Sequence, residues 1–400
     1  MIKRDLTSVL KDLEKQFAAI AVLGPRQSGK TTLVQSFFSK HNYVNLEELD
    51  IRAQALDDPR KFLQNFTNEF GIVIDEVQHA PGLLSYIQTI IDREKKKGFF
   101  IITGSQNILV NEAVTQTLAG RIAILRLLPL SLHELKKASL LPKNIDEIVF
   151  SGTYPRIFDE KIPPVTLHKN YISSYIERDV RQLKNIFDLH IFQKFMQLCA
   201  GRTGQILNLE SLGNDVGIDH KTARSWISVL EASYIIFLLY PYYKNFGKRI
   251  IKSPKLYFID TGIACSLLNI KSEQELSSHY LYGGLVESFI ISDLLKQFYN
   301  GDQKPSLYFW RDHQGNEIDC FIEAGESIVP IEIKAGQTIN ESYFKQFSYL
   351  EALESFPIKE PMVIYGGDQN RSWQKAEVIS WQHAGEIVEN IMKNKKIDKM

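Results

Sequence analysis

The chain has 400 residues, 44% of them hydrophobic, and its 47 lysines and arginines balance 47 aspartates and glutamates. This length exceeds what one hydrophobic core usually organises, so we expect two or three domains. The balanced charge excludes a globally basic nucleic-acid-binding protein, but it leaves room for a local basic patch.

Cysteine usage and hydropathy favour a cytoplasmic protein. Cys199, Cys265 and Cys320 lie far apart and lack the spacing of zinc ligands, which fits a reducing compartment. No apolar stretch follows the N-terminal MIKRDL, so we expect no signal peptide. The most apolar run, at 234–243, is too short to span ~30 Å of hydrocarbon. We therefore expect no membrane partner.

The first strong motif is GPRQSGKT at 24–31, which matches the G-x-x-x-x-G-K-[ST] pattern of a P-loop. An apolar run at 18–23 precedes it as a predicted strand, and a helical pattern follows. Glycines in such a loop let backbone N–H groups surround phosphates at a helix N-terminus. The expected ATP-binding residues are Gly24, Pro25, Arg26, Gln27, Ser28, Gly29, Lys30, Thr31 and Thr32. Lys30 would contact the β- and γ-phosphates, and Thr31 would bind Mg²⁺.

A second buried-strand pattern, GIVIDE, ends in Asp75 and Glu76. Asp75 is placed to contact Mg²⁺ through water, and Glu76 to orient or deprotonate the attacking water. An alternative, in which the acidic pair caps the following helix, requires the P-loop to be ignored. The two motifs together predict an ATP-hydrolysing site.

Two further candidates follow the third predicted strand. Ser105, in ITGSQN, is our preferred residue for sensing the γ-phosphate, with Gln106 or Asn107 as alternatives and a plain turn also open. Arg121, in LAGR, is a candidate arginine finger acting in cis or in trans, although surface arginines are common. Action in trans would require a homo-oligomer.

The motifs GPRQSGKTTL, YVNLEELD, VIDEVQHAP, ITGSQN, LAGR and LPLSLHEL, in this order, resemble the AAA-family ATPases of bacteria and archaea. More narrowly, they resemble an uncharacterised group in which a companion domain follows the ATPase domain. The resemblance spans about residues 15–370. It implies an α/β P-loop fold of the additional-strand, catalytic-glutamate class, with Glu76 as the glutamate.

The middle of the chain has the pattern of a winged helix, which the resemblance also implies. A proline-rich stretch at 151–165 marks the exit from the first domain. Beyond it, 209–236 predicts a helix–turn–helix in which Asp219 caps the second helix, and two strands follow. The link between these strands carries five cations and no acid, so we expect it to contact DNA phosphates, although a solvated charged tip is the alternative. These cations are Lys244, Lys248, Arg249, Lys252 and Lys255.

The last part of the chain predicts a helix followed by a hairpin. Glu287 lies on the apolar face of the helix, where a carboxylate needs a partner: Lys334, another basic side chain, or a metal. In the hairpin, strand alternation places Glu332 and Lys334 on one face beside Asp319. Two carboxylates suit a second divalent ion, Mg²⁺ or Mn²⁺, and the lysine suits the charge developed at phosphorus.

A helix carboxylate followed by D–x(12)–E–x–K resembles the PD-(D/E)XK nuclease superfamily, with Glu287, Asp319 and Glu332 as metal ligands and Lys334 as the catalytic lysine. The proline usual before the aspartate is Ile318 here. A salt-bridged hairpin is the alternative, and members of this superfamily can lose cleavage and keep the fold.

These patterns predict an ATPase domain at 1–160, a helical and winged-helix domain at 161–268, and a restriction-endonuclease-like α/β domain at 269–400. The leading hypothesis is an Mg²⁺-dependent ATPase acting on DNA, with an active or vestigial nuclease-like domain. The rival is a nucleotide-dependent switch that binds a protein partner. A metabolic kinase is poorly supported, because no acceptor pocket is evident after the ATP motifs.

Overall fold

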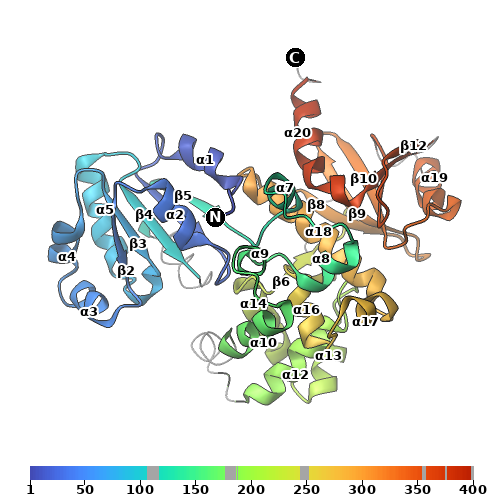
Figure 1. The fold of residues 1–400 in the computed structure, drawn as a ribbon, viewed down its shortest axis with the longest axis horizontal. Coiled ribbons are helices and arrows are strands. Elements are labelled where there is room, and N and C mark those ends of the chain that lie inside the picture. The colour runs from blue at the N-terminus through green and yellow to red at the C-terminus, as the bar shows by residue number, and fades with distance from the viewer. Residues whose placement is uncertain are drawn as a thin grey trace. The chain divides into compact units, whose positions relative to one another are not determined.

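A computed structural model of the chain describes residues 1–105, 117–175, 186, 188–243, 252–353, 357–373 and 376–397 (Figure 1). The chain divides into two compact units, which are described separately. Unit 1 contains Met1–Pro129, Ala232–Tyr234 and Tyr299–Gln303; unit 2 contains Leu130–Glu231, Ile235–Phe298 and Lys304–Met400. Most of the predicted middle and last domains thus lies in unit 2, together with residues 130–160, which were predicted to end the first domain. The predicted domain boundaries stay a prediction.

Unit 1 alternates strands and helices. Its elements are α1 (Leu6–Leu13), β1 (Ala19–Leu23), α2 (Lys30–Phe37), β2 (Asn42–Asn45), α3 (Leu49–Asp57), α4 (Pro59–Phe66), β3 (Ile72–Asp75), η1 (Val77–His79), α5 (Leu83–Glu94), β4 (Phe100–Gly104) and β5 (Ile122–Arg126). Local chemistry sets several boundaries. Asp58, for example, accepts a hydrogen bond from the Lys61 amide at the start of α4, and Pro59 occupies the first helical position.

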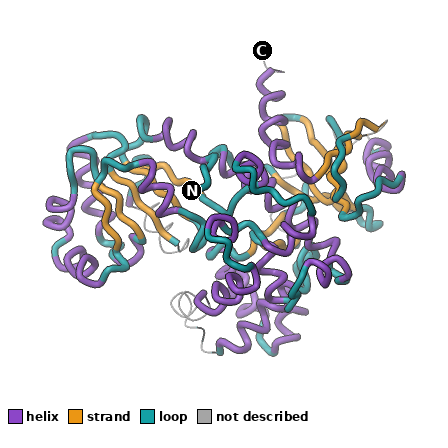
Figure 2. Tube along the Cα trace, in the orientation of Figure 1, coloured by secondary structure: helices purple, strands orange, loops and turns teal. Residues whose placement is uncertain are grey.

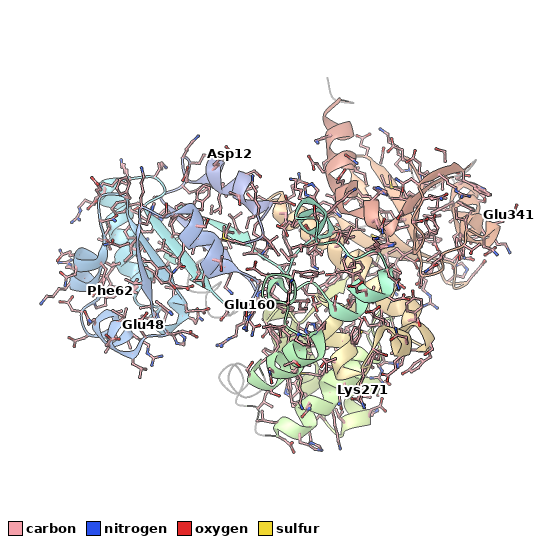
Figure 3. All side chains as sticks on the ribbon, in the orientation of Figure 1. Asp12, Glu48, Phe62, Glu160, Lys271 and Glu341 are labelled. Atoms are coloured by element: carbon pink, nitrogen blue, oxygen red, sulfur yellow. The ribbon has the colours of Figure 1, made fainter. Side chains whose placement is uncertain are left out.

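The five strands form one parallel sheet in the order β2-β3-β4-β1-β5. The additional strand β4 lies between β1 and β3, as the resemblance implies. Helices α1 and α2 pack on one face, through residues such as Leu10 and Val34. Helices α4 and α5 pack on the other through Phe62, labelled in Figure 3, and Ile87. This three-layer α/β arrangement confirms the predicted P-loop fold class for unit 1.

The first part of unit 2 is mostly helical (Figure 2). Its elements are α7 (Leu132–Lys137), α8 (Ile145–Ser151), α9 (Pro155–Asp159), α10 (Pro164–Ser174), α12 (Leu189–Ala200), α13 (Leu209–Val216), α14 (His220–Ala232), β6 (Ile236–Leu239), β7 (Lys255–Phe258), α16 (Thr261–Leu267) and α17 (Glu273–Ser278). Strands β6 and β7 pair as an antiparallel hairpin.

The predicted helix–turn–helix is formed by α13 and α14. Gly217 ends α13 in the left-handed conformation at φ 76°, which glycine adopts without a side-chain clash. Asp219 then accepts hydrogen bonds from the amides of Lys221 and Thr222 and starts α14. The predicted inward residues of α14, which are Ala223, Ile227 and Leu230, are buried.

The rest of unit 2 contains a six-stranded mixed sheet in the order β12-β13-β11-β10-β9-β8. Its elements are α18 (Tyr282–Asn300), β8 (Leu307–Arg311), β9 (Glu317–Ala324), β10 (Ser327–Lys334), η3 (Glu341–Phe344), α19 (Lys345–Ala352), β11 (Met362–Tyr365), β12 (Arg371–Trp373), β13 (Ala376–Ser380), η4 (Trp381–Glu386) and α20 (Ile387–Ile397). The predicted hairpin is β9–β10, which turns at Gly325 with φ 73°.

The β6–β7 hairpin is joined to this sheet within unit 2. The Phe309 amide of β8 donates to the Tyr240 carbonyl at 3.1 Å, and the Tyr242 amide donates to the Phe309 carbonyl at 2.6 Å. On the other side, Ser292 of α18 donates through its hydroxyl to the carbonyl of Ile259 at 2.6 Å. Strand β7 is therefore held beside α18, which carries Glu287.

Candidate active sites

The P-loop connects the carboxyl end of β1 to α2. Gly24 has φ 157°, and a Cβ there would overlap the carbonyl oxygen of Leu127. Gly29, at φ 92°, is the N-cap of α2, so the helix begins at Lys30 with its amides directed at the loop. Free amides at a helix N-terminus favour anions, which fits phosphate binding.

The buried Lys30 side chain lies over the loop itself. Its Nζ donates to the carbonyls of Gly24 and Pro25 at 3.0 and 2.9 Å. Arg4 braces the loop from outside the motif, because its guanidinium donates to the carbonyls of Ser28 and Leu128 at 2.6 and 2.7 Å. Arg4 was not predicted. It lies 24 positions from Ser28, and no local pattern connects them.

Asp75, at the end of β3, is almost completely buried and accepts three hydroxyl hydrogen bonds. Its Oδ2 accepts from Thr31 Oγ1 and from the Tyr43 hydroxyl, each at 2.7 Å, and its Oδ1 accepts from Thr103. Burial, and then the hydrogen bond to Asp75, raise the pKa of Tyr43. Thr31 and Asp75, predicted to share an Mg²⁺ ion, thus lie together, and Tyr43 and Thr103 are additional partners.

Glu76 and Ser105 also meet. Glu76 Oε2 accepts hydrogen bonds from the Ser105 hydroxyl at 3.0 Å, from the Ser105 amide at 3.3 Å and from the side-chain amide of Gln78. Glu76 itself has φ 58°, which is uncommon for a residue with a side chain. The alternatives Gln106 and Asn107 lie outside the described residues. Gln78 was not predicted, although it lies only two positions from Glu76.

Arg121 lies at the opposite edge of the sheet from the P-loop. It precedes β5, and the register places Ile122 beside Ala19 at the start of β1, whereas Arg126 lies beside Leu23 next to the P-loop. Its guanidinium makes two hydrogen bonds to Asp92, at 2.6 and 3.0 Å. The prediction that Arg121 acts in cis is therefore wrong, because the full length of strand β5 separates Arg121 from the end of the sheet at which the P-loop lies. Action in trans stays a prediction.

The second candidate site lies on β9 and β10. Lys334 Nζ is 2.5 Å from Glu332 Oε2 and 3.5 Å from Asp319 Oδ2, and Asp319 Oδ2 also accepts from the Ile333 amide at 2.8 Å. The three predicted hairpin residues are thus brought together. Burial, and then the negative charge of Asp319, raise the pKa of Glu332 and also that of Glu287.

The partner of Glu287 is Lys255, which was predicted to contact DNA. Lys255 Nζ lies 3.1 Å from Glu287 Oε1 and 2.5 Å from Glu317 Oε1, and the Tyr257 hydroxyl donates to Glu287 Oε1 at 2.5 Å. Lys255 is only 3% exposed, so it cannot contact a DNA phosphate, and that prediction is wrong. Burial lowers the pKa of Lys255, but Glu287, Glu317 and Asp319 together raise it above the usual lysine value.

The chemistry of this second site fits a cation only in part. Glu332 Oε1 is buried and accepts no hydrogen bond from the described residues, as expected of an oxygen available to a cation. However, no three His, Cys, Asp or Glu side chains converge as a metal site anywhere in the described part of the chain. Two lysines lie among the carboxylates instead.

The remaining predicted DNA contacts are Lys244, Lys248 and Arg249, which lie outside the described residues, and Lys252, which is exposed. The outer face of α14 is also exposed and presents Lys221, Arg224 and Ser228. Among the described helices, none is long and apolar enough to cross a bilayer.

Three known families match consecutive parts of the chain. Residues 16–136 match the AAA domain family. Residues 142–274 and 282–384 match two families that are described as domains of unknown function, DUF8612 and DUF4143. With the parallel sheet, the P-loop and the acidic pair on β3, the first match identifies an AAA-type, nucleotide-binding P-loop ATPase domain.

The chain is also similar to whole proteins. An uncharacterised protein of Mycobacterium tuberculosis is 26% identical over 369 residues, which cover 92% of this chain and 80% of that protein. One from Methanocaldococcus jannaschii is 22% identical and covers 94% of this chain and 87% of that protein. Among solved structures, a Walker-type ATPase of Pyrococcus abyssi has a TM-score of 0.45 at 14% identity, covering 66% of this chain and 94% of that one.

Proposed function

We propose that the protein couples Mg²⁺-dependent ATP hydrolysis in unit 1 to DNA binding by the helix–turn–helix of unit 2. The observation that carries the first half is the 2.7 Å hydrogen bond between Thr31 Oγ1 and Asp75 Oδ2. These are hard oxygen donors, which fit Mg²⁺, and Thr31 and Asp75 are the residues that would hold it. When bound, Mg²⁺ would offset negative charge on the phosphates.

The protein's own groups then have separate roles. Lys30 would exchange its contacts with the loop carbonyls for the β- and γ-phosphates, where it offsets charge that develops on the transferred group. Glu76 would accept a hydrogen bond or a proton from the attacking water. Ser105 and Gln78 position the Glu76 carboxylate through their hydrogen bonds to Oε2. Most of the rate enhancement would come from positioning and electrostatics.

The second half of the proposal is supported by the exposed face of α14. A helix that follows a tight turn and is fixed on a buried inner face can present its outer side chains to a groove of DNA. Lys221 and Arg224 supply positive charge there, and Lys252 adds a cation on the link between β6 and β7. Neutralised phosphates release counterions, so binding of this kind weakens steeply with salt.

The test is the ATP hydrolysis rate with and without a mixed-sequence DNA duplex, at about 50 and about 200 mM salt. We expect DNA to stimulate hydrolysis, and the stimulation to fall as salt rises. The double variant Lys221→Ala/Arg224→Ala should reduce the salt slope of DNA binding by about two. Lys11→Ala/Lys15→Ala removes two exposed charges, one on α1 and one just after it, and is the matched control. Indifference of hydrolysis to DNA at both salt concentrations would contradict the proposal.

The alternative is a nucleotide-dependent switch whose unit 2 binds a protein partner. The observation that favours it is the burial of Lys255, which removes one of the five cations that were predicted to contact DNA. Under this alternative, the nuclease-like residues Asp319, Glu332 and Lys334 would form a salt-bridged scaffold. An ATPase rate unaffected by DNA, together with no loss of Mn²⁺ binding in Asp319→Asn/Glu332→Gln, would support it.

A further inference from the structure

Lys255 occupies an unusual place for a cation. It is the first residue of β7, yet its side chain is buried between Glu287 of α18 and Glu317 of β9. Its Nζ also lies 5.5 Å from the centre of the Phe309 ring, which covers it on one side. A buried ammonium group is stable only with close opposite charge, which these two carboxylates provide.

The backbone around Lys255 is fixed from both sides. The Leu256 amide donates to the Gln205 carbonyl at 3.0 Å, and the Gly204 amide donates to the Leu256 carbonyl at 2.8 Å. On the α18 side, Ser288 Oγ accepts from the Phe258 amide at 3.2 Å. The strand that carries Lys255 is therefore held in place beside the carboxylates, and the lysine is a built part of the site.

Carboxyl groups nevertheless outnumber cationic groups in this cluster, four to three. Its carboxylates are Glu287, Glu317, Asp319 and Glu332, and its cations are Lys255, Lys334 and, from the surface, Arg311 at 3.4 Å from Glu317 Oε2. Asp319 interacts with both lysines of the cluster, because its charge acts on Lys255 as well as on Lys334. The carboxylate oxygen without a hydrogen bond, Glu332 Oε1, lies on the Lys334 side of the cluster and not on the Lys255 side. The cluster is thus divided into a half filled by Lys255 and a half with spare acceptor capacity.

We propose that Lys255 takes the place of a divalent cation between Glu287 and the carboxylates of β9, so that the site binds a divalent metal tightly only when this ammonium group is displaced. A metal ion bound to Glu287 and the Lys255 ammonium group at Glu287 Oε1 would be two positive charges beside one carboxylate. They would repel each other strongly in a poorly solvated site. This inference rests on the nuclease-like site that the sequence predicts. It also goes further, because it makes metal binding depend on strand β7 of the β6–β7 hairpin.

The test uses the full-length chain with Lys30→Ala, without nucleotide, and Mn²⁺ followed by electron paramagnetic resonance. Adding Lys255→Met should increase Mn²⁺ affinity at least tenfold. Lys255→Arg keeps the positive charge and should bind Mn²⁺ like the parent. Lys255→Met/Glu287→Gln removes both charges of the pair and should lose the gain. Equal titrations of the parent and Lys255→Met, or an equal gain in Lys255→Arg, would overturn the proposal.

Folding provides an independent readout, because Lys255→Met leaves two carboxylates without their cation. We expect Lys255→Met to unfold at a lower temperature than the parent, and Mn²⁺ to raise its Tm by more than it raises that of the parent. If Lys255→Met does not fold and Mn²⁺ does not restore the fold, the proposal is also overturned. None of these readouts uses DNA or ATP, so a failure here is distinct from a failure of the proposed ATPase or DNA function.

Discussion

The Tyr43 hydroxyl lies 2.7 Å from Asp75 Oδ2, so a tyrosine on β2 holds the acidic residue of the proposed Mg²⁺ site. Thr31 shares the same oxygen, and Thr103 holds the other one. Asp75 is therefore fixed before any ligand binds, by hydroxyl groups from a helix and two strands. A carboxylate held in this way needs little rearrangement when a metal arrives.

Tyr43→Phe tests this arrangement, because it removes one hydroxyl and keeps the ring. We expect unit 1 to lose about 1.5–3 kcal/mol of stability, the usual magnitude for a hydrogen bond to a charged group. Urea unfolding followed by far-ultraviolet circular dichroism would measure this loss. Tyr86→Phe is the matched control, since Tyr86 is 39% exposed. Equal midpoints for the two variants would show that the Tyr43 hydroxyl does not support Asp75.

Lys30→Ala and Glu76→Gln should separate nucleotide binding from hydrolysis. Lys30→Ala removes the cation at the phosphates, so we expect the binding of a fluorescent ATP analogue to be lost. Glu76→Gln keeps the shape of the side chain but cannot accept a proton, so binding should persist while kcat falls about 10²-fold or more. An unchanged hydrolysis rate in either variant would remove the role assigned to that residue.

Ser105 and Gln78 contact the same oxygen of Glu76, so their effects should not add. We expect Ser105→Ala and Gln78→Ala each to lower kcat by roughly tenfold, and the double variant to lower it by less than the product. ATP affinity should change little in any of the three, since the contacts are to Glu76. Full additivity in kcat would mean that the two side chains act independently of the carboxylate.

The parts of the site that were predictable from the sequence are those fixed by local motifs. The P-loop places Lys30 and Thr31 on a strand–loop–helix, and a strand ending in Asp75 must reach the same edge of a parallel sheet. The hairpin spacing likewise brings Asp319 to Glu332. Each of these relationships depends on one turn or one strand end, which short-range patterns encode.

The contacts that were not predicted join residues that lie far apart in the sequence. Lys255 was predicted to contact DNA phosphates because it follows a basic link between two strands, whereas strand β7 is buried at all four of its positions. Nothing local indicates that α18 and β9 would supply its partners. Arg121 was different, because a signal was available. A residue that precedes a parallel strand lies at the opposite edge from the loops that follow the strands. That rule excludes Arg121 from the P-loop of its own domain.

Arg121→Ala compared with Asp92→Ala tests action in trans. The two variants break the same exposed ion pair, so any purely structural consequence should be common to both. If Arg121 completes the site of a neighbouring copy, Arg121→Ala alone should lower the ATPase rate, and the loss should appear only at protein concentrations at which the chain self-associates. Equal rates for the two variants across a concentration series would exclude Arg121 as a finger.

Glu231, near the end of α14, should make the stability of unit 2 depend on pH. Burial raises its pKa from 4.5 to about 7. Because the folded pKa exceeds the unfolded one, the folded state favours the protonated form. The resulting stabilisation is fully present below about pH 4.5 and is lost as pH rises through about 7. With partial exposure taken into account, we expect the loss to be about 1–3 kcal/mol.

Glu231→Gln removes this titration and keeps the size of the side chain. The Tm of the variant, measured relative to the original chain, should therefore rise between pH 5 and pH 8, about the range over which Glu231 ionises in the folded state. Glu210→Gln, at an exposed position on α13, is the matched control and should show the same difference at both pH values. A Tm difference for Glu231→Gln that does not change with pH would mean that Glu231 is ionised in the fold throughout this range. The burial of its carboxylate would then have to be offset by solvent, because no hydrogen bond or ion pair is seen for it among the described residues.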